Sequence, residues 1–153
     1  MLFRSIIGVG NIGKAVTRRA RAFGMKVYGT DIVDIDHVFV SESGIQMVGL
    51  KDLIVNADFI SINCDLNPSS HHLIDRETLS WAKPNAVVIN TARGPIIHEE
   101  ALVEALQKGK IAGAALDVFE VEPLVAPIHF WQRLENMNSA SGVVVAGNCF
   151  DCV

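Results

Sequence analysis

Long runs of apolar residues are absent from this sequence. The apolar stretch at residues 6–10 is followed at once by Asn11 and soon afterwards by Lys14. A membrane-spanning helix needs about 20 predominantly apolar residues, and the apolar region of a signal peptide needs about 7–15. We therefore expect neither a spanning helix nor a signal peptide, and no membrane partner.

An excess of basic charge is also absent. The chain has 13 lysines and arginines against 17 acidic residues, which gives a formal net charge of −4. The densest basic cluster, Arg18, Arg19 and Arg21, is typical of the solvated face of a helix and forms no stripe. The sequence therefore argues against a nucleic-acid partner.

Cysteine is scarce, with three residues in 153. Cys149 and Cys152 form a C-x-x-C motif, but a zinc site needs two more ligands, and a redox motif normally opens a helix. We interpret the pair as part of a C-terminal tail and expect no metal site. Free thiols without a secretory signal indicate a cytoplasmic location.

Half of the residues are hydrophobic and a fifth are charged, as in a globular domain with a core. Short apolar runs alternate with amphipathic segments, which indicates a parallel sheet with helices on both faces. The predicted fold class is α/β, a Rossmann-type doubly wound parallel sheet in three αβα layers. We expect strands at 3–9, 25–30, 46–48, 59–63, 86–90 and 111–118, helices at 12–23, 50–56, 76–81 and 98–108, and otherwise loop from 34 to 49.

A glycine-rich motif follows the first predicted strand. Gly8, Gly10 and Gly13 fit G-x-G-x-x-G, with Asn11 and Ile12 opening the helix. In a dinucleotide site the first glycine makes the tight turn, the second lets the backbone approach the pyrophosphate, and the third lets helix and strand pack closely. The helix N-terminus offers N–H groups and positive potential to the phosphates. Alone, the motif is a weak signal.

An acidic residue at the end of the second strand strengthens this interpretation. Asp31 follows Gly13 by 18 residues, close to the spacing of about 20 expected for the acid that binds the adenosine ribose hydroxyls. The alternative is an ordinary turn residue at a strand end. No arginine adjoins Asp31 to meet a 2′-phosphate, and a carboxylate would repel one. The sequence therefore predicts NAD, not NADP, as cofactor.

Two longer motifs are more selective than the glycines. Residues 90–95 read Asn-Thr-Ala-Arg-Gly-Pro, and residues 113–123 read Gly-Ala-Ala-Leu-Asp-Val-Phe-Glu-Val-Glu-Pro. Both resemble the signature of the D-isomer-specific 2-hydroxyacid dehydrogenase family, and the resemblance runs from about residue 6 to residue 131. It implies hydride transfer between NAD(H) and a small 2-hydroxy or 2-oxo acid, and it makes a homodimer possible.

The resemblance also implies roles for individual residues. Arg93 matches the catalytic arginine that grips the carboxylate and carbonyl of the 2-oxo acid, as a bidentate guanidinium can. Glu122 matches the glutamate that raises the pKa of a catalytic histidine. Asp117 matches the acid near the nicotinamide carboxamide, and Thr91 lies beside the nicotinamide. The alternatives are a surface arginine for Arg93 and a structural hydrogen-bonding group for Asp117.

The expected catalytic histidine is missing. It should lie about twenty residues beyond Glu122, but the aligned position falls near Gly142 or Val144, and neither residue can transfer a proton. His129 precedes Phe130-Trp131 and resembles a different loop of the family.

The ends of the chain also differ from the family pattern. We expect an NAD-binding domain at 1–135, an atypical C-terminal tail at 136–153 and no substrate-binding domain. The chain would then be a truncated, spliced or frame-shifted product or an excised domain, with impaired or no turnover.

Two rival functions remain open. One is a noncatalytic NAD(H)-sensing or protein-interaction module, like the corepressor branch of the family. The missing histidine favours it, and Arg93 and Glu122 argue mildly against it. The other is a different Rossmann protein, such as a methyltransferase, for which the 90–95 motif would be a coincidence.

Overall fold

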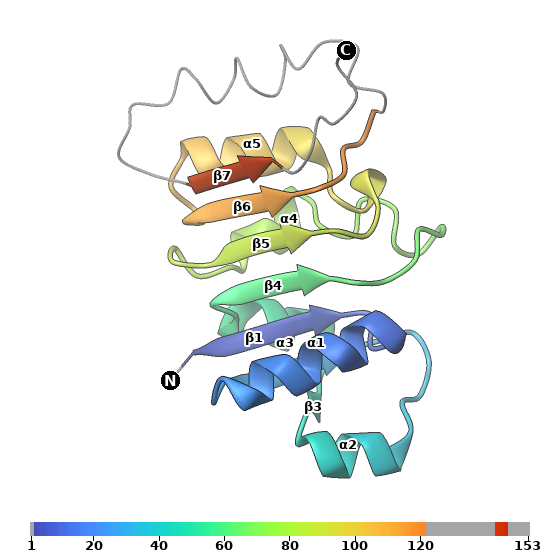
Figure 1. The fold of residues 1–153 in the computed structure, drawn as a ribbon. Helices are drawn as coiled ribbons and strands as arrows, with labels where there is room; N and C mark the ends of the chain where they lie inside the picture. The colour runs from blue at the N-terminus through green and yellow to red at the C-terminus, as the bar shows by residue number, and fades with distance from the viewer. Residues whose placement is uncertain (1, 122–142, 147–153) are drawn as a thin grey trace, which may run out of the picture.

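The computed structural model describes residues 2–121 and 143–146 of the chain, and these residues form one parallel sheet. The seven strands lie in the order β3-β2-β1-β4-β5-β6-β7, and every neighbouring pair is parallel. The labelled arrows of β1, β4, β5, β6 and β7 in Figure 1 point the same way. The strands are β1 Phe3–Ile7, β2 Lys26–Thr30, β3 Gln46–Met47, β4 Phe59–Ile62, β5 Val87–Asn90, β6 Gly113–Leu116 and β7 Val143–Ala146.

Helices cover both faces of the sheet. They are α1 Asn11–Ala22, α2 His37–Ser43, α3 Leu50–Asn56, α4 Arg76–Ser80 and α5 Glu99–Gln107, with a short 3₁₀ helix at Gly94–Ile96. One core cluster joins Ile6 to residues of α1 and α2, and a larger one joins Ile7 to residues of α3, α4 and α5. Successive residues of β1 thus serve opposite faces, as the period of two in a strand requires. The predicted three-layer α/β fold is confirmed.

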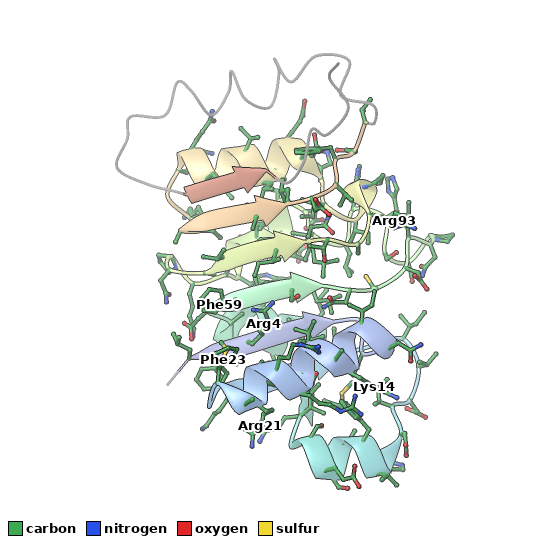
Figure 2. All side chains as sticks on the ribbon, in the orientation of Figure 1. Arg4, Lys14, Arg21, Phe23, Phe59 and Arg93 are labelled. Carbon is green, nitrogen blue, oxygen red and sulfur yellow. The ribbon has the colours of Figure 1, made fainter. Side chains whose placement is uncertain are left out.

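The loop predicted between residues 34 and 49 is wrong in part, because it contains α2. The Asp36 side chain accepts a hydrogen bond from the Val38 N–H at 3.0 Å and caps the helix. Phe39 is its only buried residue, and the charged groups of Lys14 and Arg18 lie 5.2 and 5.3 Å from its ring centre. Figure 2 shows Lys14 of α1 on the side toward α2. A helix held by one aromatic side chain has no apolar periodicity to reveal it.

Four residues of the segment 136–153 form a strand that the sequence patterns do not predict. Val143–Ala146 form β7, which pairs in parallel with β6 from Gly113–Val143 to Leu116–Ala146. The run Val-Val-Val-Ala is apolar and mostly β-branched, so its intrinsic preference is for a strand.

The described helices are short, and none within residues 2–121 has the length and hydropathy to cross a membrane.

The strand ends matter more for function. In an open parallel sheet, ligands bind beyond the carboxyl ends of the strands, where the strand order reverses. Here that point lies between β1 and β4, since β1 pairs with β2 on one side and β4 on the other.

A buried carboxylate links three strands at their amino ends, on the side of the sheet opposite to the carboxyl ends. The Asp58 side chain accepts hydrogen bonds from the Phe3 N–H at 2.8 Å, Lys83 Nζ at 3.1 Å and Asn85 Nδ2 at 3.0 Å. The Phe3 N–H, followed by the Lys83 and Asn85 donors, lowers the pKa of Asp58, although burial opposes this shift. The ionised form therefore stabilises the amino ends of β1, β4 and β5.

We predict that Asp58→Asn lowers the free energy of unfolding by about 2 kcal/mol at pH 7, because the amide nitrogen replaces one of the two accepting oxygens and then faces a hydrogen-bond donor. The folded pKa lies below the unfolded value of about 3.9, so this stabilisation is present at neutral pH and is lost as pH falls through the folded pKa. Urea denaturation at pH 7 and pH 3 measures it, with exposed Asp52→Asn as the control. An equal gap between Asp58→Asn and wild type at both pH values would contradict the assignment.

Candidate functional site

The loop between β1 and α1 depends on glycine at two positions. Gly8 has φ +89°, and a Cβ there would lie 2.5 Å from the backbone nitrogen of Cys64. A Cβ on Gly13 would lie 2.1 Å from the carbonyl oxygen of Gly8. The first and third glycines therefore let α1 and β4 pack directly against this turn.

Gly10 is different, because its missing side chain faces open space. A Cβ there would meet nothing within 4 Å among the described residues. Gly10 is the N-cap residue of α1, with no side-chain cap and no acidic residue in the first turn among the described residues. The first N–H groups of a helix have no partner inside the helix, and the helix dipole makes this end positive. Asn11 and Ile12 are exposed at this end, so it can receive an anionic group.

Asp31 lies beside the glycine loop, at the end of β2. Its Oδ2 accepts a hydrogen bond from the Val9 N–H at 2.6 Å, and its Oδ1 accepts one from the Val33 N–H at 3.2 Å. Each carboxylate oxygen has further lone pairs available. The side chain is partly exposed and can accept hydrogen bonds from the hydroxyl groups of a ligand.

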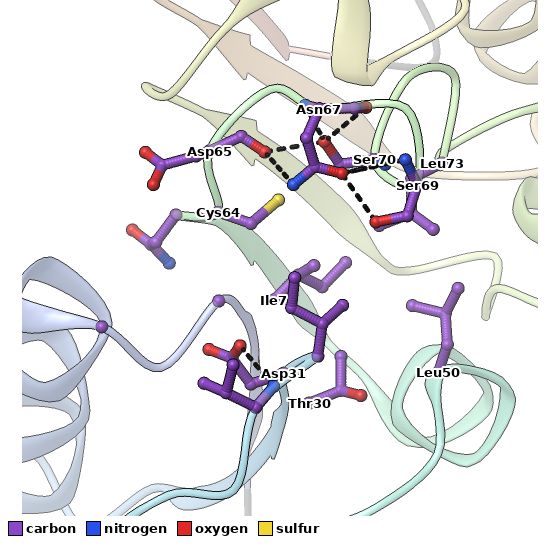
Figure 3. Close-up of a pocket in the computed structure, with 15 residues that line it drawn as sticks. Ile7, Thr30, Asp31, Leu50, Cys64, Asp65, Asn67, Ser69, Ser70 and Leu73 are labelled. Carbon is purple, nitrogen blue, oxygen red and sulfur yellow. Dashed lines mark hydrogen bonds between the residues drawn. The ribbon is translucent and has the colours of Figure 1, made fainter.

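A cavity of about 460 Å³ opens between the glycine loop and the segment after β4. Asp31 lies on one side of it, and the turn from Asn67 to Ser70 lies on the other (Figure 3). The Asn67 side chain accepts from the Ser69 and Ser70 N–H groups, and Ser70 Oγ donates to the Asp65 carbonyl at 2.7 Å. These bonds fix the turn, so this wall of the cavity is preformed.

Apolar side chains complete the same cavity. Leu50 and Leu73 line it, and so does Cys64, whose pKa is raised mainly by burial. The thiol is therefore neutral at pH 7. A concave site with apolar walls and a few fixed polar groups is typical of a small-ligand pocket.

A second group of residues gathers beyond β5 and β6. Asn90 is 1% exposed, and its side chain donates to the Arg93 carbonyl at 2.9 Å and accepts from the Ala92 N–H at 3.0 Å. Its own carbonyl accepts the Asp117 N–H at 3.0 Å. Asn90 therefore shapes the turn that carries Thr91 and Arg93 and ties it to the loop after β6.

The Arg93 side chain is exposed at the carboxyl end of the sheet (Figure 2). It lines a second cavity of about 360 Å³ together with Gly94, Phe119 and Glu120. A Cβ on Gly94 would lie 1.7 Å from the carbonyl oxygen of Phe119, so the two loops touch. The arrangement can bind an anion through an exposed guanidinium.

The site residues expected from the sequence form two groups. The first group lies at the β1–α1 loop and contains the three glycines, Asn11, Ile12 and Asp31. The second group follows the neighbouring strands β5 and β6 and contains Thr91, Arg93 and Asp117. Glu122 lies outside the described residues, as do His129, Gly142 and the C-x-x-C cysteines. Among the described residues there is no cluster of three or more potential metal ligands.

Several residues that build this region have no separate signal in the sequence. Asn90 belonged to a recognised motif, but its buried side-chain bonds had no separate signal. His72 and Glu120 were also missed, although the side chains of these two residues, 48 positions apart, lie within hydrogen-bonding distance.

The family model for the NAD-binding domain of D-isomer specific 2-hydroxyacid dehydrogenases matches residues 4–140. This match covers most of the chain, and the chain therefore belongs to that family. The domain it contains is the family's NAD-binding domain, and the resemblance drawn from the two motifs is confirmed.

A protein of Staphylococcus aureus strain MRSA252, classed by its name among the 2-hydroxyacid dehydrogenases, is 52% identical over 118 residues. That match covers 77% of this chain and only 37% of the relative. The chain therefore spans little more than a third of the length of such relatives.

Solved structures agree with the fold. A D-lactate dehydrogenase from Sporolactobacillus sp. superposes with a TM-score of 0.83 at 33% identity, covering 95% of this chain and 45% of that one. A D-isomer specific 2-hydroxyacid dehydrogenase from Lactobacillus delbrueckii ssp. bulgaricus, solved in an NAD-complexed form, gives 0.81 at 31% identity, covering 95% and 46%.

We predict that Gly10→Ala leaves the folded protein intact, because its methyl group enters only the open space above the helix end. The same methyl group should weaken NADH binding about tenfold or more, because it occupies the space that the pyrophosphate would enter. Gly13→Ala should instead destabilise the fold by about 1–3 kcal/mol, because its methyl group overlaps the Gly8 carbonyl. Thermal unfolding and calorimetric titration of both variants separate the two effects. Loss of stability in Gly10→Ala would contradict the distinction.

Proposed function

We propose that this chain binds NAD and NADH at the β1–α1 loop. The observation that carries the proposal is the open space above Gly10 at the uncapped start of α1, next to the Asp31 carboxylate. The pyrophosphate would lie on the first N–H groups of α1, and the adenosine would enter the 460 Å³ cavity. Asp31 would accept hydrogen bonds from the ribose hydroxyls.

The residues around the cavity favour NAD over NADP. Among the described residues that line it, the charged ones are Asp31 and Asp65, and none is lysine or arginine. A 2′-phosphate would lie beside the Asp31 carboxylate and would be repelled.

For the whole protein we propose the family reaction, in which a 2-hydroxy acid is oxidised or a 2-oxo acid reduced. NAD(H) supplies or accepts the hydride. Arg93 would hold the substrate carboxylate and stabilise negative charge on the carbonyl oxygen. Thr91 and Asp117 would contact the nicotinamide end, and Glu122 would support a catalytic histidine. A homodimer in the cytoplasm, without nucleic-acid or membrane partners, completes the proposal.

The chain alone should turn over slowly or not at all. The segment after residue 122 has no histidine at the expected place. The same missing histidine favours a second candidate function, a noncatalytic module that senses NAD(H) or binds a partner protein. The two candidates share the dinucleotide site and differ in turnover.

We predict that NADH binds to the pure chain at least tenfold more tightly than NADPH. Asp31→Asn should weaken NADH binding about tenfold and reduce the preference over NADPH, because the ribose loses a charged acceptor. NADH fluorescence titration measures both constants. Asp34→Asn, which removes a charge three residues further on, is the matched control and should bind like wild type. Absence of NADH binding to folded protein would overturn the proposal.

A separate prediction concerns turnover. With NADH and glyoxylate or hydroxypyruvate, the pure chain should show no measurable loss of absorbance at the nicotinamide band. Steady oxidation of NADH by the chain would show that another group supplies the proton, and it would exclude the noncatalytic alternative.

A further inference from the structure

His72 has an unusual backbone conformation. Among the described residues it is the only one other than glycine with a positive φ, at +52°. Residues with a side chain are uncommon in this left-handed region, and such residues persist where the surrounding structure holds them. The contacts of His72 with its surroundings therefore hold it in this conformation.

His72 contacts both loops of the Arg93 region. Its backbone N–H donates to the Pro95 carbonyl at 2.8 Å, two residues beyond Arg93. Its ring nitrogen Nε2 lies 2.5 Å from Oε1 of Glu120, in the loop after β6. The ring also contacts the rings of His71 and His98, with ring centres 4.0 and 4.6 Å away.

Glu120 is held from more than one side. Besides the contact with His72, its Oε2 accepts the Glu99 N–H at 3.2 Å, and its own N–H donates to the Glu99 carboxylate. Burial alone would raise the pKa of Glu120, but the bonds from His72 and from the Glu99 N–H outweigh it and lower the pKa. The carboxylate is therefore charged at neutral pH, and its bond with His72 is a strong, charge-assisted one when the imidazole donates.

Glu120 and Arg93 line the same cavity of about 360 Å³. A single residue thus joins the turn that carries Arg93, through its backbone, to the loop that begins at Asp117, through its side chain. We propose that His72 is a positioning residue that sets these two loops relative to one another at the nicotinamide end of the dinucleotide site. The inference rests on the proposed function.

The effect should be confined to that end of the site. Neither His72 nor Glu120 lines the cavity proposed for adenosine. The turn before His72 is fixed by the bonds of Asn67 and Ser70, and Ile74 is tied to the Ile96 carbonyl by its own N–H at 3.1 Å. A change in the His72 side chain leaves all these bonds in place.

Two variants of similar size isolate the side-chain bond. His72→Gln keeps an N–H donor near the position of Nε2, and His72→Leu removes it. Both have a Cβ, so both carry the same backbone strain. NADH and ADP-ribose are the two probes, because ADP-ribose lacks only the nicotinamide. The ratio of their dissociation constants, measured by calorimetry, reports contacts at the nicotinamide end alone.

In wild type and His72→Gln we expect NADH to bind more tightly than ADP-ribose by the same factor. In His72→Leu this preference should fall about three- to tenfold, while ADP-ribose affinity changes less than twofold. If His72→Leu does not fold, Glu120→Gln, which removes the charge of the acceptor, should show the same loss of preference.

The outcomes that contradict the inference are distinct from failure of the proposed function. If His72→Leu keeps the wild-type preference, or if His72→Gln loses it equally, the side-chain bond does not position the loops. Equal affinity of wild type for both probes would also overturn the inference and leave dinucleotide binding intact. Binding of neither probe to folded wild type would refute the proposed function itself.

Discussion

The close approach of α1 to the turn after β1 is the constraint on which the rest of this structure depends. The backbone of Gly13 lies so near the Gly8 carbonyl that no side chain fits between them. Because of this contact, the positive end of α1 lies directly at the carboxyl edge of the sheet. The space above Gly10 stays open. One loop therefore contains both the glycines that allow close packing and the glycine that leaves room for a ligand.

The topology of the sheet then surrounds this helix end with polar groups. β1 lies between β2 and β4, so the loops that follow those strands bring Asp31 and the turn from Asn67 to Ser70 to opposite sides of one cavity. The strands β5 and β6 place Thr91, Arg93 and Asp117 further along the same edge. In the proposed function, the parts of the ligands would follow the order of the strands along this edge, with adenosine between β2 and β4, pyrophosphate at α1 and substrate beyond β5.

Much of this was predictable because it is local in sequence. The glycine motif, Asp31 at the end of β2 and most strands and helices come from short patterns with a known physical meaning. α2 was missed because one buried residue, Phe39, anchors it, and β7 because a four-residue run carries little periodicity. The contacts of Asn90 and the bond between His72 and Glu120 join distant or buried groups, and only the folded chain brings them together.

The central claim is that the start of α1 holds the pyrophosphate while Asp31 holds the ribose. A ¹⁵N-resolved NMR titration of the chain with NADH tests it most directly. The account predicts that the amides of residues 10–13, and of Val9 and Val33, which are bonded to Asp31, shift first and furthest. The amides of Phe3 and Val87, at the opposite edge of the sheet, should stay unchanged. Saturable binding with shifts at that opposite edge and none at residues 10–13 would contradict the account.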